Sequence, residues 1–143
     1  MKMSCKYCGI VEKPHKCPHK IKRKTNRYRI DTRHYEGKAY KKARETALID
    51  CDKLCLWSFY IYGELVTAEE THHIIEILED ESKASDPNNL IPLTEENHEL
   101  VHQLYKRSEL SKERTKELLF NMINDYKKGD LTLKKYRKEI NKL

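Results

Sequence analysis

The sequence predicts an α+β fold with a small metal-binding segment at its N-terminus. Residues 54–75 are rich in aromatic and β-preferring side chains on both sides of Gly63-Glu64, which is typical of a β-hairpin. Apolar residues recur at spacings of three and four in several other segments, which predicts helices before and after this hairpin. Three of the five cysteines lie in the first 20 residues, where there is too little apolar material to form a core.

The expected elements follow one another in a simple order. They are a cysteine-containing segment at 1–20, a basic arm at 20–33, a helix from Gly37, strands at 54–62 and 65–75, a polar loop at 79–88, a short apolar bridge at 90–93, and helices at 95–106, 111–129 and 133–143. Thr94 is the expected N-cap of the first of the late helices. We therefore expect three regions, at residues 1–35, 36–106 and 107–143.

Charge is distributed unevenly along the chain. The sequence has 29 Lys and Arg against 23 Asp and Glu, a net charge of +6. Residues 1–50 hold 15 basic and 5 acidic residues, for a net charge of +10, whereas residues 51–143 hold 14 and 18, for −4. A basic N-terminal part favours a polyanion as partner, most simply nucleic acid.

Composition also excludes several classes of protein. The most apolar stretch, residues 54–62, is too short to span a bilayer, so no membrane partner is expected. The N-terminus has no apolar segment typical of a secretory signal, so we expect a cytoplasmic protein. An odd number of cysteines in that compartment favours metal binding over disulfide bonds.

Four histidines are concentrated between residues 70 and 102. His72 and His73 are neighbours at the end of a predicted strand, so their side chains point to opposite faces and have different tasks. His98 and His102 are four residues apart on a predicted helix, so both project from one face at a spacing suited to binding a metal ion. Asn89 lies between the two pairs.

This stretch resembles the HNH endonuclease family, whose ββα-metal (His-Me finger) fold is a hairpin followed by a metal-binding helix. The resemblance rests on Thr-His-His-Ile at 71–74, Asn-Asn-Leu-Ile-Pro-Leu at 88–93 and Asn-His-Glu-Leu-Val-His at 97–102, in the family's order and approximate spacing. It covers about residues 38–106 and includes Arg44, Leu54-Cys55 and Gly63 upstream. It implies a bacterial or phage-infected host as the setting.

The resemblance also implies a role for each residue. His73 would be the general base that activates water, and Asn89 would brace the loop that orients it. His72, His98 and His102 would hold one divalent ion, Mg²⁺, Mn²⁺ or Ni²⁺. The implied activity is hydrolysis of DNA phosphodiester bonds to 5′-phosphate and 3′-hydroxyl ends. The family serves phage genome packaging, homing and restriction, so a homodimer and phage packaging proteins stay open as partners.

The chain departs from the family pattern at a structural zinc site. Many HNH proteins carry two CxxC pairs around the core, but here these positions read Cys55-Leu-Trp-Ser58 and Thr94-Glu-Glu-Asn97. We therefore expect no zinc there, and packing by Trp57, Phe59, Leu90 and Leu93 in its place. Cys51 and Cys55 are expected to be buried core cysteines.

The N-terminal cysteines form a second metal-binding pattern. Cys5 and Cys8 make a CxxC knuckle, and Cys17 follows nine residues later. With one histidine they complete a Cys₃His zinc site, for which His19 is preferred over His15. The following basic arm is expected to contact DNA phosphates through Lys22, Arg23, Lys24, Arg27 and Arg29.

Two alternatives compete with the nuclease hypothesis. His98-Glu-Leu-Val-His102 also spells HExxH, the zinc-protease signature, with Glu99 as base and Glu109, Glu113 or Glu117 as a third ligand. The protease hypothesis leaves His72, His73, Asn89 and the basic N-terminal part unexplained. The other alternative is an HNH-like module that binds DNA without cutting it, against which the complete histidine and asparagine set argues.

Overall fold

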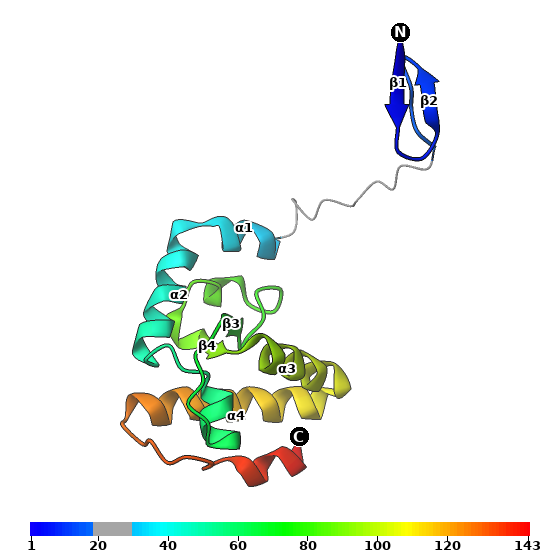
Figure 1. Cartoon of the computed structure of the whole chain (residues 1–143). Helices are drawn as coiled ribbons and strands as arrows, with labels where there is room; N and C mark the ends of the chain where they lie inside the picture. Colours follow the sequence, from blue (N-terminus) through cyan, green and yellow to red (C-terminus); the bar gives the residue numbers. More distant parts are fainter. Residues whose placement is uncertain (19–29) are drawn as a thin grey trace.

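The computed structural model describes residues 1–18 and the chain from residue 30 onward, with side chains from residue 33. Its elements are β1 (Lys2–Cys5), β2 (Gly9–Glu12), α1 (Ile30–Glu36), α2 (Lys38–Asp50), the π-helical turn η2 (Ser58–Tyr62), β3 (Glu70–His73), the 3-10 turns η3 (Glu81–Lys83) and η4 (Pro87–Asn89), β4 (Leu90–Leu93), α3 (Glu95–Arg107), α4 (Glu109–Lys127) and the 3-10 helix η5 (Arg137–Lys142) (Figure 1). The architecture is α+β with small antiparallel sheets, which confirms the predicted class. Helix α1 falls where the sequence predicted only an arm.

The sheet beside the histidines differs from the predicted hairpin. Residues 58–62 form a helical turn rather than a strand, and Ser58, Phe59, Tyr60 and Ile61 are buried in succession within it. Strand β3 instead pairs antiparallel with β4, with His72 opposite Ile91 and His73 opposite Leu90. Pro92 is tolerated in β4 because both strands of a two-stranded sheet have an open edge.

The helices predicted from Gly37, at 95–106 and at 111–129 agree approximately with the structure in position and in the face they bury, whereas the one predicted at 133–143 does not. Helix α2 buries Tyr40, Ala43 and Ala47, at helical spacing. Helix α3 begins after Thr94, whose side chain accepts a hydrogen bond from the backbone N–H of Asn97, as an N-cap does. Helix α4 begins earlier than predicted, after a Ser108 cap, and the last helical segment is the shorter η5.

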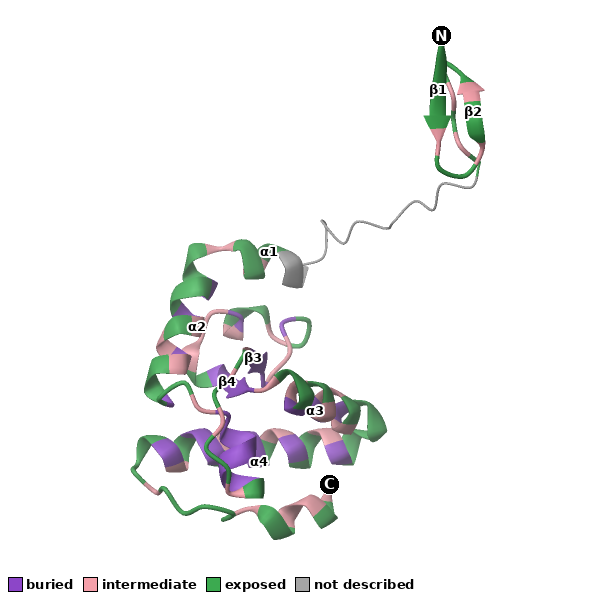
Figure 2. Ribbon diagram, in the orientation of Figure 1, coloured by how far each residue is buried: buried purple, intermediate pink, exposed green. Residues whose placement is uncertain are grey.

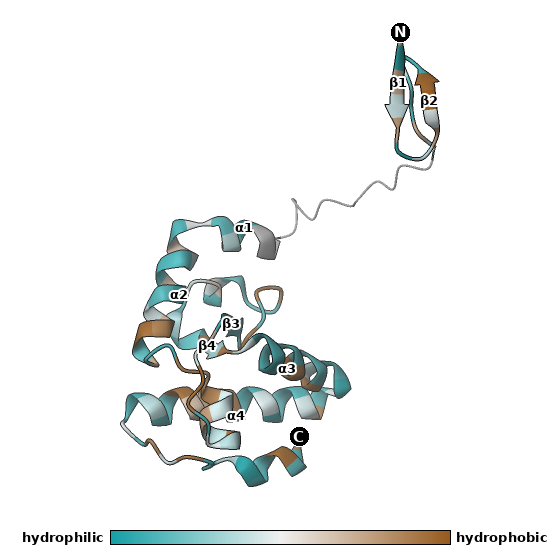
Figure 3. Ribbon diagram, viewed as in Figure 1, coloured by the Kyte–Doolittle hydropathy of each residue, from teal (hydrophilic) through white to brown (hydrophobic). Residues whose placement is uncertain are grey.

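Helix α4 contributes directly to the core. The main buried cluster joins residues of η2, β4, α3 and α4 with residues of the segments that precede η2 and follow β3: Cys51, Cys55, Leu56, Trp57, Phe59, Tyr60, Ile61, Ile74, Ile91, Leu93, Val101, Tyr105, Leu118, Leu119, Met122, Ile123 and Tyr126. Buried residues accordingly gather between β3, β4 and the facing sides of α3 and α4, while hydrophilic residues cover the outward faces (Figures 2 and 3). The region expected as a C-terminal extension therefore helps to hold the histidine-bearing elements. No helix in the described ranges has the length and hydropathy needed to cross a bilayer.

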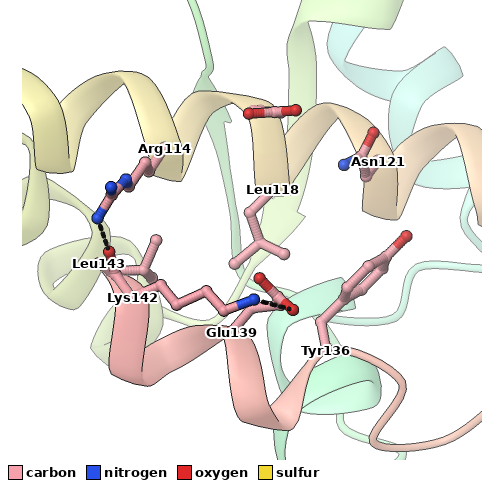
Figure 4. Close-up of a pocket in the computed structure, with 8 residues that line it drawn as sticks. Arg114, Leu118, Asn121, Tyr136, Glu139, Lys142 and Leu143 are labelled. Carbon is pink, nitrogen blue, oxygen red and sulfur yellow. Dashed lines mark hydrogen bonds and ion pairs between the residues drawn. The ribbon is translucent and has the colours of Figure 1, made fainter.

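The C-terminal segment closes one side of α4. Arg114 donates to the backbone oxygen of Lys142 at 2.7 Å, and Lys142 pairs with Glu139 at 3.2 Å (Figure 4). A surface pocket of about 460 Å³ lies between α4 and η5. Its lining mixes both charges with Leu118 and Tyr136 and holds no histidine or cysteine, so it is distinct from both metal-ligand clusters described below.

A buried polar cluster occupies the positions at which the resemblance placed a structural zinc. The side-chain nitrogen of Asn97 donates to Ser58 Oγ at 2.9 Å and to Cys55 Sγ at 3.3 Å. Cys51 and Cys55 are both buried, as predicted. Trp57, Phe59 and Leu93 join the main core as expected, but Leu90 belongs to a separate cluster with the apolar face of α2.

Candidate metal centres

Three histidines from β3 and α3 converge on one point. His72 is buried on the β3 face that packs against α3, with its ring centroid 5.1 Å from that of His98 and 5.0 Å from that of His102. One ring nitrogen of each histidine lies within 4.8 Å of the other two. His72 Nε2 is buried without a hydrogen-bond partner in the described structure, as expected of a nitrogen placed to coordinate a metal ion. The predicted group of three ligands is thus brought together.

The spacing of two of these nitrogens suits a divalent ion. His98 Nε2 and His102 Nε2 are 3.0 Å apart. Two ligands at right angles, each about 2.1 Å from an octahedral ion, are separated by about 3.0 Å. Burial is the main cause that lowers the pKa of His72 and of His102, so both favour the neutral form that coordinates metals.

Glu70 supports this cluster, and the sequence analysis missed it. Its carboxylate accepts a hydrogen bond from His98 Nδ1, which leaves Nε2 to face the other histidines. Glu70 and His72 are two residues apart on β3, so both lie on the face toward α3. The alternation of side chains along the strand could have identified Glu70 from the sequence, because it is two residues before His72. A carboxylate behind a ligating histidine fixes its tautomer and strengthens it as a ligand.

Replacing Glu70 with Gln is expected to weaken divalent-metal binding by about 10–100-fold, because His98 loses its negatively charged support. Calorimetric titration of the metal-free protein measures this change. Glu69→Gln is the matched control, since Glu69 is the adjacent exposed carboxylate and its hydrogen bonds among the described contacts, to Leu93 and from Arg44, involve only its backbone. Equal affinities in both variants would contradict a role for Glu70 behind the ligand.

His73 lies on the opposite face of β3, as the alternation predicted. Its ring stacks on Tyr40 with 5.5 Å between centroids and 21° between planes. Nε2 lies 2.8 Å from the backbone oxygen of Ala84. A carbonyl oxygen only accepts hydrogen bonds, so Nε2 carries the proton and donates it. Nδ1 is then the unprotonated nitrogen, and burial is the main cause that lowers the pKa of the ring. The neutral imidazole therefore carries its basic nitrogen on a defined side.

Asn89 ties together the loop between β3 and β4. Its side-chain oxygen accepts from the backbone N–H of Ile75 at 2.8 Å, and its amide nitrogen donates to the oxygens of Ile75 and Lys83 at 2.9 and 3.2 Å. Lys83 directly precedes Ala84, whose carbonyl holds His73. These are the contacts expected of a residue that braces the loop behind His73.

Both faces of β3 open into one pocket. It has a volume of about 310 Å³ and is lined by Tyr35, Thr71, His72, His73, Glu76, Ile77, Leu78, His98 and His102. The three-histidine cluster and the fourth histidine, His73, therefore adjoin the same space.

The N-terminal hairpin builds the second cluster. Strands β1 and β2 pair antiparallel from Lys2↔Glu12 to Cys5↔Gly9 and bring Cys5, Cys8, His15 and Cys17 together, with one ligand atom of each within 4.8 Å of the others. The Sγ atoms of Cys8 and Cys17 are 3.7 Å apart. Two sulfurs that are each about 2.3 Å from a tetrahedral zinc are separated by about 3.8 Å.

Among the described residues, His15 is the histidine of this cluster. His19 lies outside the described residues, as do Lys22, Arg23, Lys24, Arg27 and Arg29 of the predicted DNA-binding arm. His15 Nε2 is buried and has no hydrogen-bond partner in the described part of the chain, which fits an unsatisfied ligand. The four groups could hold a metal such as zinc.

The thiols of the cluster differ in acidity. Backbone N–H groups of Tyr7 and Cys8 stabilise the thiolate of Cys5 and lower its pKa to about 6. Partial burial, together with the neighbouring Cys17 and Cys5, raises the pKa of Cys8 to about 11. Crowded thiols resist losing their protons together, and a bound cation would relieve that repulsion.

Cys5→Ser is expected to abolish one bound zinc per chain, because a thiolate ligand is lost from a small hairpin with no core of its own. Cys55→Ser should retain that zinc, since Cys55 is buried in the main core and outside the cluster. Elemental analysis of the purified variants decides between these outcomes. Zinc that is lost with Cys55 and kept with Cys5 would show that the site is elsewhere.

In comparisons with known proteins, the chain matches no protein family, curated protein or solved structure at a significant level. Any function proposed for the chain therefore rests on the geometry of its two metal-ligand clusters.

Proposed function

We propose that this protein is an HNH endonuclease that hydrolyses DNA phosphodiester bonds with one divalent ion. One observation carries the proposal. Strand β3 presents His72 to the histidines of α3 and His73 to the opposite face, and both border one pocket. An ion site beside a positioned neutral imidazole suits metal-assisted hydrolysis, and the order β3, β4, α3 agrees with a ββα-metal core.

The residues divide the reaction between them. His73 Nδ1 takes a proton from water, and the water oxygen forms a bond to phosphorus. The bond from phosphorus to the 3′ oxygen breaks, and the departing oxygen takes a proton from solvent water, which leaves a 5′-phosphate and a 3′-hydroxyl. When bound at His72, His98 and His102, the divalent ion supplies electrostatic stabilisation of the phosphate and of the departing oxygen. Ala84 and Asn89 keep the ring of His73 oriented for this transfer.

The charge on α2 supports a polyanionic substrate. Lys38, Lys41 and Lys42 are exposed and form no ion pair with any other described residue. Unpaired cations attract phosphates at a distance and make binding depend on salt.

The protease alternative has little support in the geometry. The ligand that joins His98 and His102 is His72 from β3, and within the described residues none of the downstream glutamates belongs to the group. Glu99, the base that the HExxH pattern requires, is exposed. Glu99→Gln should therefore leave DNA cleavage near the wild-type rate.

A plasmid-cleavage assay tests the proposed function. Purified protein should convert supercoiled DNA to nicked or linear forms with magnesium, manganese or nickel, and excess EDTA should stop the reaction. The ends should accept ligation directly, because they carry 5′-phosphate and 3′-hydroxyl groups. Binding without cleavage across all three metals would favour the non-catalytic DNA-binding module.

A further inference from the structure

Tyr35 on α1 lies against the predicted general base. Its hydroxyl oxygen is 3.5 Å from His73 Nδ1, and the two rings meet edge to face with centroids 5.5 Å apart. Tyr40 covers the flat side of the same imidazole. The nitrogen beside Tyr35 is the unprotonated one, because Nε2 is bonded to Ala84.

Two contacts hold Tyr35 in this place. Its ring packs edge to face on Tyr40 with 5.0 Å between centroids. The adjacent His34 contacts Glu81 on the loop between β3 and β4, with 2.8 Å between Nε2 and Oε1. Helix α1 is therefore attached both to α2 and to the loop that orients His73. Tyr35 also lines the pocket that holds the three-histidine cluster.

We propose that the Tyr35 hydroxyl and His73 Nδ1 together hold the water that attacks the phosphate. This inference rests on the proposed nuclease function. Two groups 3.5 Å apart can both reach one water, since each needs a separation of only about 2.8 Å and the water can lie beside the line that joins them. The pocket in front of them provides the space.

The chemistry of this arrangement is simple. The water donates one hydrogen to His73 Nδ1 and the other to the oxygen of Tyr35, so a lone pair of the water is free to point at phosphorus. The first hydrogen is transferred to Nδ1 as the new bond to phosphorus forms, and Tyr35 keeps its own proton. Holding a nucleophile by two acceptors restricts it to orientations that react.

Tyr35→Phe removes the hydroxyl and keeps the ring. Under saturating DNA and metal, its single-turnover cleavage rate should fall about 10-fold, the effect of one hydrogen bond in the transition state. The half-saturating DNA concentration and the calorimetric metal affinity should stay at wild-type values. Tyr62→Phe is the matched control, since Tyr62 is 43% exposed against 46% for Tyr35 and lies outside the pocket.

A second measurement does not depend on cleavage. In metal-free protein labelled with ¹⁵N-histidine, Tyr35→Phe should shift the Nδ1 resonance of His73 and leave those of His98 and His102 in place. An unchanged His73 resonance would contradict the contact.

The outcomes separate the inference from the proposed function. Wild-type protein that cuts no DNA with any metal would overturn both. Active wild-type protein with an equally active Tyr35→Phe variant would overturn only the role of Tyr35. A faster variant would also overturn it, because the hydroxyl would then be covering the base nitrogen. A parallel loss of metal or DNA affinity would show that Tyr35 is merely structural.

Discussion

His73→Ala is expected to slow DNA cleavage by about 10²–10⁴-fold, the usual cost of losing a general base. Metal affinity should stay near the wild-type value, because His73 lies on the face of β3 opposite His72 and contacts Tyr35, Tyr40 and Ala84 rather than the histidine cluster. Single-turnover cleavage and calorimetric metal titration on the same preparation measure the two quantities.

Added imidazole provides a control for this prediction. Part of the lost rate should return when imidazole enters the space left in the pocket, since the missing group is the proton acceptor. A variant that loses the metal and is not rescued would mean that His73 is a ligand. In that case, His72 and His73 would have exchanged roles.

His98→Ala should produce the opposite pattern, because a residue that binds the metal directly is lost. The metal affinity should fall by more than it does in Glu70→Gln, for which a loss of about 10–100-fold is expected. Cleavage should be lost at metal concentrations that saturate the wild-type protein. High metal should restore part of it, because His72 and His102 remain as ligands and His73 is intact. The measurement is the cleavage rate as a function of metal concentration.

Gln103→Ala is the matched control on the same helix. Gln103 is exposed on α3 next to His102 and does not belong to the histidine group. Its variant should bind metal and cut DNA as the wild-type protein does. If His98→Ala also behaves as wild type, the cluster does not hold the catalytic ion, and the nuclease proposal fails.

Much of the candidate site could be predicted because it depends on short-range geometry. The four-residue spacing of His98 and His102 places them on one face of α3, and the adjacency of His72 and His73 separates them across β3. Thr94 caps α3 through a local hydrogen bond. Each of these relations joins residues at most four positions apart in one element, so the backbone geometry of that element alone decides which side chains share a face.

The strand pairing could not be predicted in the same way. Residues 58–62 favour a strand by composition, yet they form a helical turn, in which Phe59, Tyr60 and Ile61 are buried in the core. The partner of β3 is β4, beyond a loop that Asn89 holds through three hydrogen bonds to the backbone. Packing overrides strand propensity at such positions.

The sequence by itself determined the α+β class, the positions of α2, α3 and α4, and the identity of the three histidines that meet and of the cysteines that cluster. Only the tertiary structure decided that β4 pairs with β3, that α4 completes the core, that His15 joins the cysteines, and that Glu70 and Tyr35 adjoin the histidines. The first group follows from periodicity and spacing within single elements and, for the meeting of His72 with His98 and His102, from the resemblance to the HNH family. The second depends on which apolar surfaces pack together across distant parts of the chain, a balance of burial and loop closure that no local pattern encodes.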